Sequence, residues 1–303
     1  MNKKIKNESF ECCGKPSTVS LMKPDDFNEI NQWCIDEGWN LGLYGSEIYY
    51  KIDPQGHFIL KNDETIASIS LIKHSPYFFT LGPFIVKKEY RRQGVGDILW
   101  KYAMNRMNKE HPDALIVLYA VSSQVSRYQK SGFAPVLKNQ RWYIDSSNAF
   151  QLFDSLNCYP ITPDLIPAIS LYDQHHYFTS RQLLFTQILQ KPETNGLVYM
   201  DDNIIKGFGI VRRCVRGYRI GTLIADTKEI AQSLIGGLLR FCNQESVLID
   251  IPDCNPQGIA CMNTFNAVRR PQEDTVTMIK GTQHANLIKN WEQQYGLFSL
   301  EIG

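Results

Sequence analysis

A strand, a cationic glycine-rich turn and a helix follow one another in this chain, and this succession constrains the fold more than any other feature. Residues 78–86 read FFTLGPFIV, an almost unbroken apolar run, and residues 89–100 read EYRRQGVGDILW. Beyond the turn, apolar side chains recur on one helical stripe, formed by Ile98, Leu99, Tyr102, Ala103 and Met107. A buried strand that leads into an amphipathic helix is a building unit of mixed α/β sheets.

The rest of the first half predicts further strands on both sides of this unit. Apolar or alternating runs predict strands at 57–60, 65–74, 114–120 and 133–144. Helices are expected from 24–26 through Cys34 and again at 123–130. The order is a run of antiparallel strands followed by strand–helix–strand–helix–strand. We therefore assign the fold class α/β, with a mixed sheet.

Gly82 and Pro83 interrupt the apolar strand 78–86 in its middle. Proline has no backbone N–H, so it removes one donor from the hydrogen-bond ladder of a sheet. We therefore expect a bulge, or a local separation of neighbouring strands, at this point.

Two polar segments divide the chain into three regions. The N-terminus, MNKKIKNESFECCGK, is basic but lacks the apolar core of a signal peptide, and we expect residues 1–17 to be a flexible leader. The segment 145–148, DSSN, is a polar break and our candidate linker. The predicted domains are therefore 18–147, which carries the glycine-rich turn, and 148–303.

The second half partly repeats the first. Without gaps, residues 66–86 align with residues 205–225, which read IKGFGIVRRCVRGYRIGTLIA. The apolar pattern agrees better than the identities do, and a strand, a helix and a strand follow in both halves. Chance alternation between two hairpins is the alternative, but the shared order favours a diverged duplication.

Composition excludes several classes of protein. The formal net charge is +1, so no overall field attracts nucleic acid or an anionic membrane surface, and any affinity for an anion must be local. No apolar run approaches the roughly 18–20 residues of a membrane span. The eight cysteines show no C-x-x-C spacing, which indicates reduced thiols, no metal site and a cytoplasmic location.

The turn itself has the chemistry of an anion site. A helix N-terminus presents unpaired N–H groups and a partial positive charge, which suit a phosphate. Glycines allow the backbone to approach an oxygen closely, and here Gly94 and Gly96 flank the start of the helix beside Arg91 and Arg92. Alone, R-x-x-G-x-G is weak evidence, because an ordinary tight turn with solvated arginines has the same pattern.

A second motif adds context to the first. Residues 128–133, YQKSGF, follow the next strand and short helix. At this point the chain resembles the GNAT acetyltransferase superfamily, whose acetyl-CoA loop reads R-x-x-G-x-G and whose later signature reads Y-x-x-x-G-F. Residues of this sequence that match the two motifs are Arg91, Gly94, Gly96, Tyr128, Gly132 and Phe133. The resemblance covers roughly residues 18–145.

A narrower resemblance extends to the whole chain. Residues 38–43, GWNLGL, and residues 53–58, DPQGHF, look like a subgroup of two-domain GNAT proteins with a degenerate second domain. The resemblance implies a tandem GNAT-like fold, in which 18–147 is the catalytic domain and 148–303 the degenerate one.

The resemblance also implies a co-substrate and the residues that hold it. Acetyl-CoA would bind with its pantetheine arm along the strand near Ile85 and Val86, and a strand N–H near Val86 would polarise the thioester carbonyl. Its pyrophosphate would lie on the turn. The residues expected to bind it are Ile85, Val86, Arg91, Arg92, Gln93, Gly94, Val95 and Gly96.

Tyr128 is the implied catalytic residue, a general acid that protonates the departing CoA thiolate. A buried aromatic residue with a satisfied hydroxyl is the alternative interpretation. Two departures from the family pattern are noted: an asparagine seven residues earlier is replaced by Val121, and Asp97 puts a carboxylate near the anion. The general base is open among a water chain and the candidates Glu47, Asp53, His57 and His74.

The second half lacks the same chemistry. Arg91, Gly94 and Gly96 align with Ile230, Ser233 and Ile235 at the shift of 139, and we expect Asp226 and Glu229 to form a capping box there. Tyr128 and Gly132 correspond to Met262 and Asn266 at a shift of 134. We therefore expect this half to support the first, to wall the acceptor cleft or to form a homodimer.

Other polar residues of the second half have two interpretations each. Asp250, Asp253 and Asn255 either face a cationic acceptor or form a polar turn at a strand end. His175 and His176 are adjacent, so they point apart on a helix, and a solvated face is favoured over a metal site.

Three functions fit the sequence. The leading hypothesis is an acetyl-CoA-dependent N-acetyltransferase that acts by direct attack of a primary amine, either a small molecule or a protein or peptide amine. The second is a protein that senses acetyl-CoA with little or no turnover. The third is an interaction module in which the RRQGVG turn has no ligand.

Overall fold

We describe a computed structural model of the chain, covering residues 8–148, 157–177, 179–281 and 290–300. Its first half contains, in order, β1 (Glu8–Cys12), β2 (Lys15–Leu21), α1 (Asp26–Asp36), α2 (Gly45–Ile52), β3 (His57–Lys61), β4 (Thr65–Ser75), β5 (Phe78–Val86), α3 (Val95–Glu110), β6 (Leu115–Val121), α4 (Val125–Lys130) and β7 (Ala134–Asp145). The predicted strands and helices of this half are present, with α2 in addition.

The second half has a similar order of elements. It contains β8 (Cys158–Pro160), α5 (Ile166–Gln174), α6 (Gln182–Ile188), β9 (Thr194–Asp201), β10 (Ile204–Arg213), β11 (Tyr218–Ala225), α7 (Lys228–Leu239), β12 (Ser246–Pro252), α8 (Pro256–Thr264), β13 (Val268–Arg269), β14 (Thr275–Lys280) and β15 (Gln294–Gly296). The hairpin β10–β11 and helix α7 repeat the hairpin β4–β5 and helix α3, as the internal alignment predicted.

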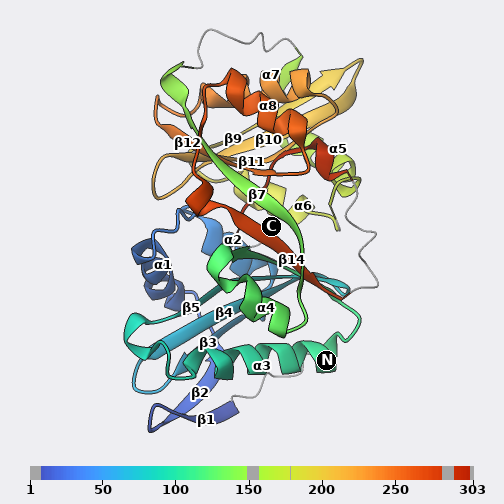
Figure 1. Cartoon of the computed structure of the whole chain (residues 1–303). Coiled ribbons are helices and arrows are strands. Elements are labelled where there is room, and N and C mark those ends of the chain that lie inside the picture. The colour runs from blue at the N-terminus through green and yellow to red at the C-terminus, as the bar shows by residue number, and fades with distance from the viewer. Residues whose placement is uncertain (1–7, 149–156, 178, 282–289, 301–303) are drawn as a thin grey trace.

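The strands of both halves join in one mixed sheet. Its main path runs β1-β2-β3-β4-β5-β6-β14-β7-β12-β11-β10-β9-β8, with parallel pairs at β5–β6 and β11–β12. Helix α3 lies along one lobe and α7 and α8 cover the other, while β7 runs from the first lobe to the second (Figure 1). The mixed α/β class expected from the sequence is therefore confirmed.

The two halves exchange strands where they meet. Strand β14 from the end of the chain lies between β6 and β7, pairing Met278 with Leu118 on one side and with Pro135 on the other. Strand β7 in turn pairs with β12 from Asn139 to Asp145. A domain boundary at 147/148 therefore divides the chain but not the sheet. Residues 149–156, next to that boundary, lie outside the described residues.

The N-terminal leader departs from expectation. Residues 1–7 lie outside the described residues, but 8–17 form β1 and the start of β2 instead of a flexible segment. Cys13 and Gly14, at φ 55° and 69°, make the left-handed two-residue turn that suits a hairpin. Cys12 and Val19 are buried in the core, and this burial holds the hairpin on the sheet.

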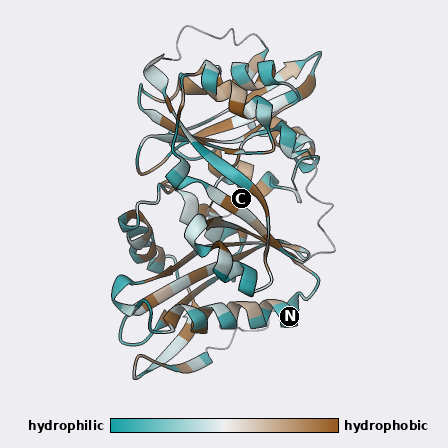
Figure 2. Ribbon diagram, viewed as in Figure 1, coloured by the Kyte–Doolittle hydropathy of each residue, from teal (hydrophilic) through white to brown (hydrophobic). Residues whose placement is uncertain are grey.

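Separate hydrophobic clusters cover the sheet faces. In the first half, α3 places Leu99 and Ala103 against β4, β5 and β6, while α1 covers another cluster with Ile30 and Cys34. In the second half, α7 packs Leu234 and Ile235 on the sheet. The strands carry most of the apolar residues, and the outer helix faces are polar (Figure 2). The functional site is therefore sought in the middle of the sheet, along the neighbouring strands β5, β6 and β14.

Candidate active site

Strands β5 and β6 separate in the middle of the sheet. They pair in parallel only from Phe78–Leu81 to Leu115–Leu118, while β5 stays paired with β4 as far as Val86. The β4–β5 register also shifts opposite Gly82 and Pro83, between Ile69 and Leu71. The separation expected at Gly82-Pro83 is confirmed, and it opens a wedge between two neighbouring strands.

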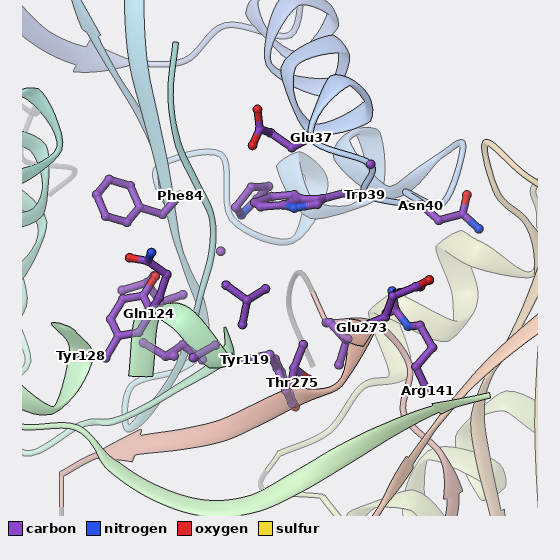
Figure 3. Close-up of a pocket in the computed structure, with 18 of the residues that line it drawn as sticks. Glu37, Trp39, Asn40, Phe84, Tyr119, Gln124, Tyr128, Arg141, Glu273 and Thr275 are labelled. Atoms are coloured by element: carbon purple, nitrogen blue, oxygen red, sulfur yellow. Dashed lines mark ion pairs between the residues drawn. The ribbon is translucent and has the colours of Figure 1, made fainter. Parts of the chain in front are cut away.

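A cavity of about 320 Å³ occupies this wedge. Its walls come from the loop after α1, from β5, β6 and α4, and from the second half of the chain. The residues that line it are Glu37, Gly38, Trp39, Asn40, Leu81, Gly82, Pro83, Phe84, Leu118, Tyr119, Ala120, Val121, Gln124, Tyr128, Arg141, Arg219, Gln272, Glu273, Thr275 and Leu300. Tyr128 and Gln124 lie on one side, and Arg141 and Glu273 on the other (Figure 3).

The turn before α3 exposes a row of backbone donors. Arg92 and Gly94 have φ of 62° and 79°, which turns the chain sharply before the helix begins at Val95. Across the described residues, the five N–H groups from Arg92 to Gly96 have no hydrogen-bond partner. No side chain caps this helix of 16 residues. Such a row of free donors at a positive helix end can hold an anion.

Glycine is favoured at positions 94 and 96 of the turn for different structural reasons. A Cβ added at Gly94 would meet open space, but the left-handed backbone there disfavours other residues. At Gly96, a Cβ would lie 3.3 Å from Val86 Cγ2 and 3.3 Å from an Arg127 guanidinium nitrogen. A side chain at this position would therefore crowd the end of β5 and the helix start.

The polar side chains of the turn have distinct partners. Arg91 donates from Nε to the Val86 carbonyl at 2.8 Å and from Nη2 to Glu37 at 3.0 Å, and this pair lowers the pKa of Glu37. Gln93 donates to the Glu89 carbonyl. Arg92 is exposed and forms no ion pair with the described residues. Arg92, not Arg91, is thus the cation left available for an added anion.

Asp97 places a carboxylate on the first turn of α3, close to the expected anion. Arg127 from α4 bonds it at 2.7 Å, and the same guanidinium lies 5.6 Å from the centre of the Phe84 ring. The negative charge is therefore compensated locally, on a surface shared by α3 and α4.

The end of β5 presents backbone groups to the open side of the wedge. Lys87 N–H donates to the Ile66 carbonyl, so the alternating pattern turns the N–H groups of Val86 and Phe84 away from β4. The side chains of Ile85 and Val86 pack on opposite clusters and do not line the cavity. Only their backbone is available for the role expected of them.

Tyr128 lies at the cavity wall on α4. Its ring packs 5.4 Å from Trp100 and 6.2 Å from Phe133, and no described residue hydrogen-bonds its hydroxyl. Burial raises the pKa of this phenol above its usual value. The hydroxyl therefore keeps its proton at neutral pH and can donate it into the cavity.

None of the four candidate bases lines the cavity. Glu47 bonds Lys191 and Lys51, which lower its pKa, and Asp53 accepts from the Lys73 N–H. The imidazoles of His57 and His74 are bonded to Ser70 and Thr80, and burial lowers their pKa values to about 4 and about 3. The carboxylates that do line the cavity, Glu37 and Glu273, were not among the candidates.

The second half supplies one wall of the cavity. Arg141 on β7 bonds both oxygens of Asp250, and Arg219 on β11 lies 3.2 Å from the same carboxylate. Glu273 and Thr275 precede and begin β14. Sequence reasoning missed these residues because they come together only through the strand exchange. For Arg219, the available signal was a single arginine inside the otherwise uncharged stretch GYRIGTL.

The polar residues proposed to face a cationic acceptor have structural partners. Asp250 is 1% exposed in its side chain, and although burial opposes ionisation, Arg141 and Arg219 lower its pKa. Asp253 accepts from the Lys138 N–H, and Asn255 caps α8 through the Gly258 N–H. Of the two interpretations, the structure therefore favours the structural one, in which these three residues hold strands and a helix and do not contact a cationic acceptor.

Helix α7 of the second half has a closed first turn. Thr227, not Asp226, is its cap, accepting from the Ile230 N–H at 3.4 Å, while Asp226 accepts from the Tyr172 hydroxyl at 2.7 Å. The expected Asp226–Glu229 capping box is therefore wrong, because Thr227 is the cap and the residue three positions after it is Ile230. Met262, in place of Tyr128, is buried.

Two further findings concern histidines and membranes. His176 is buried and hydrogen-bonds Gln293, and the described part of the chain holds no group of three or more potential metal-ligating side chains. Within the same part, no helix has the length and apolar character needed to cross a bilayer.

Comparisons with known proteins place both halves in one superfamily. Two family models, both described as acetyltransferase (GNAT) domain, match residues 46–142 and 169–296. Holothin acyltransferase of a Pseudoalteromonas species is 25% identical over 251 residues, which is 82% of each chain.

Solved structures extend the likeness to the whole chain. A Pyrococcus horikoshii protein described as an acetyltransferase aligns over 100% of both chains with a TM-score of 0.81 and 18% identity. A tandem GNAT protein from the clavulanic acid biosynthesis pathway aligns over 87% of this chain and 98% of its own, with a TM-score of 0.58 and 11% identity.

Proposed function

The chain is a two-domain member of the GNAT acetyltransferase superfamily and an acyltransferase, and from this premise we propose that it is an acetyl-CoA-dependent N-acetyltransferase. The acceptor is a primary amine that attacks directly while both substrates are bound. The observation that carries this proposal is the row of five N–H groups from Arg92 to Gly96, which have no hydrogen-bond partner among the described residues and lie beside a wedge that Tyr128 lines.

The proposed cofactor site consists of this row of N–H groups and the adjacent end of β5. The N–H groups of Arg92, Gln93, Gly94, Val95 and Gly96 would hold the diphosphate of CoA, with Arg92 as the free cation. The backbone of Ile85 and Val86 would run beside the pantetheine arm. Arg91 acts indirectly, since it fixes the Val86 carbonyl and the loop at Glu37.

Acetyl-CoA supplies the activated thioester, and the residues of this chain provide position and a proton. The Val86 N–H, on the open side of β5, is the donor proposed for the acyl oxygen. The Tyr128 hydroxyl, kept neutral by burial, is the proton donor for the thiolate that leaves. No metal takes part in this scheme.

The size and walls of the cavity favour a small acceptor. Its volume of about 320 Å³ lies at the lower end of the range that is typical of small-molecule sites. The loop at Trp39 and Asn40 and the second-half residues Glu273 and Leu300 restrict access for a folded protein. We therefore favour a small amine over a protein or peptide amine. A homodimer stays a prediction.

We extend the proposal to the roles of the two domains and to the cellular location of the protein. Residues 18–147 carry the catalytic parts, and 148–303 form the degenerate domain that walls the acceptor side. The eight cysteines form no disulfide among the described residues, which suits a reducing compartment, so we place the reaction in the cytoplasm.

The test combines binding and turnover in the full chain. Calorimetry should detect CoA binding at one site per chain, and release of free thiol from acetyl-CoA should rise when amines are added. Binding without amine-dependent thiol release would favour the acetyl-CoA sensor, and absence of CoA binding would contradict both functions.

A further inference from the structure

A row of charged side chains crosses the sheet behind the cavity. Arg212 on β10 lies directly opposite Arg219 on β11, and Asp250 on β12 lies directly opposite Arg141 on β7. Strand β12 also pairs with β11, so the four side chains occupy adjacent strands. Arg141 and Arg219 both line the cavity, and Arg141 lies on the side opposite Tyr128 (Figure 3).

Arg219 has unused hydrogen-bonding capacity in this row. Its side chain is 2% exposed, and it lies 3.2 Å from Asp250, but this ion pair lacks hydrogen-bond geometry. Its Nε and Nη1 have no hydrogen-bond partner in the described part of the chain. A buried guanidinium with free donors is costly unless an acceptor group joins it.

Three other polar side chains that line the cavity already have hydrogen-bond partners. Asn40 donates to the Arg216 carbonyl and accepts from the Arg216 N–H. Thr275 accepts from Asn139, and Glu37 is bonded by Arg91. Arg219 is therefore distinguished from these neighbours as a buried donor group with capacity left for a ligand.

The charge of the row is unbalanced. Arg141 and Arg219 share the single carboxylate of Asp250, while Glu273 is shared between Arg141 and Arg270. Like charges directly opposite in a sheet destabilise it, and Arg212 and Arg219 form such a pair. An added negative charge beside Arg219 would reduce this repulsion.

We propose that Arg219, with Arg141 beside it, forms a subsite for a carboxylate carried by the acceptor, so that the substrate is an amine with a carboxylate at its far end. This inference rests on the proposed function and names its substrate class. The carboxylate lies against the second-half wall, and the amine points across the cavity toward the Tyr128 side. A planar guanidinium recognises a carboxylate through paired donors, which would distinguish an amino acid from its neutral amide.

The test uses the full chain with matched acceptors. Amino acids are compared with their amides, with their decarboxylated amines and, for β-alanine, with phosphoethanolamine, by release of free thiol from acetyl-CoA. In addition, N-acetylated amino acids and N-acetylated amino acid amides are titrated by calorimetry, which needs no turnover. We expect the carboxylate to improve kcat/KM and binding by roughly ten- to a hundredfold.

Variants identify the group responsible. Arg219→Gln should remove most of the preference for the carboxylate while CoA affinity is retained. Arg240→Gln is the matched control, because Arg240 is exposed at the end of α7 and does not line the cavity. This variant should keep the wild-type preference for the carboxylate. If Arg219→Gln does not fold, Arg219→Lys serves instead, and it should lower the preference at least several-fold because it lacks the planar fork.

Equal treatment of acids and amides by the wild type would overturn the inference, as would a preference that survives in a folded Arg219 variant. A preference for the phosphate compound would overturn the assignment to a carboxylate. CoA binding is measured on the same samples. A protein that binds CoA but ignores the carboxylate contradicts only this inference, whereas one that binds no CoA contradicts the proposed function.

Discussion

Helices α3 and α7 follow equivalent strands of the two domains, yet their first turns differ. At α3, the left-handed Gly94 and the small Gly96 leave five N–H groups without partners among the described residues. At α7, the Thr227 side chain occupies the Ile230 N–H, and the first turn is built without glycine. The comparison teaches that the same strand–helix unit retains or loses an anion site according to how its cap is made.

The later signature shows the same division between backbone and chemistry. Gly132 has φ of 85°, and Asn266 in the second half has φ of 50°, so both domains keep a left-handed turn after the short helix. Tyr128, with its hydroxyl at the cavity, is matched by Met262, which is buried. The fold element persists in the second domain while the proton donor does not.

The largest expected effect is on turnover. Tyr128→Phe should lower kcat by about 10²–10⁴-fold, because the departing thiolate loses its proton donor, while the affinity for CoA stays unchanged. Thiol release and calorimetry on the same sample measure both quantities. Met262→Leu, the matched change in the second domain, should alter neither. An undiminished kcat in Tyr128→Phe would remove the acid role.

The next effect is on the cofactor. Gly96→Val should weaken CoA binding by about 10²-fold, which corresponds to about 2.7 kcal/mol, because the added side chain would press against Val86 and Arg127 at the helix start. Calorimetry with CoA gives the change. Ser233→Val on α7 is the control and should leave CoA affinity as it is. Equal losses in both variants would show a general effect on stability.

The acid sensitivity of the first domain comes next. Burial lowers the pKa of His57 to about 4, against 6.5 for the ordinary side chain. Below pH 6.5 the unfolded chain binds a proton that the folded chain refuses until about pH 4, so stability falls with falling pH in this window. The loss between pH 7.5 and pH 5 should be on the order of 2 kcal/mol.

Urea unfolding at both pH values measures this difference. In His57→Gln the pH dependence should be smaller by that amount, although the variant also loses the bond to Ser70. The control is Met262→Leu in the second domain, which removes no titratable group and should leave the slope unchanged. An identical slope in wild type and His57→Gln would contradict the buried, neutral histidine.

The smallest effect separates the two arginines of the turn. Arg92→Ala should weaken CoA binding by roughly fivefold, and the loss should shrink in high salt because the side chain is exposed. Arg91→Ala should instead lower the free energy of unfolding by about 1 kcal/mol, since it removes the bonds to the Val86 carbonyl and Glu37. Calorimetry and urea unfolding on both variants measure the pair. If Arg91→Ala weakened CoA binding and Arg92→Ala lowered the free energy of unfolding, the proposed roles of the two arginines would have to be exchanged.

Local pattern predicted most of the first domain. The strand at 78–86, the turn and the amphipathic helix could be recognised because strand, glycine and helix signals agree over a short stretch. Helix α2 was missed: it has eight residues, and Ile48 and Tyr49 are held by packing against Phe185 and Ile188 of α6. Such tertiary support has no local signal.

The site was predicted on one side only. The glycine-rich turn and Tyr128 were recognised as motifs, and the structure places Tyr128 at the cavity. Arg141, Arg219 and Glu273 were not recognised. Arg219 and Glu273 belong to the second half, which reaches the cavity because β14 enters between β6 and β7. A strand pattern shows that a segment is extended, but not which strand it will pair with.

The central claim is that the first turn of α3, and not that of α7, holds the diphosphate of CoA. Amide hydrogen exchange with and without CoA tests it at the donors themselves. The account predicts slower exchange at residues 92–96 when CoA is bound and no change at 227–231. Unchanged exchange at 92–96, or equal protection of both turns, would contradict it.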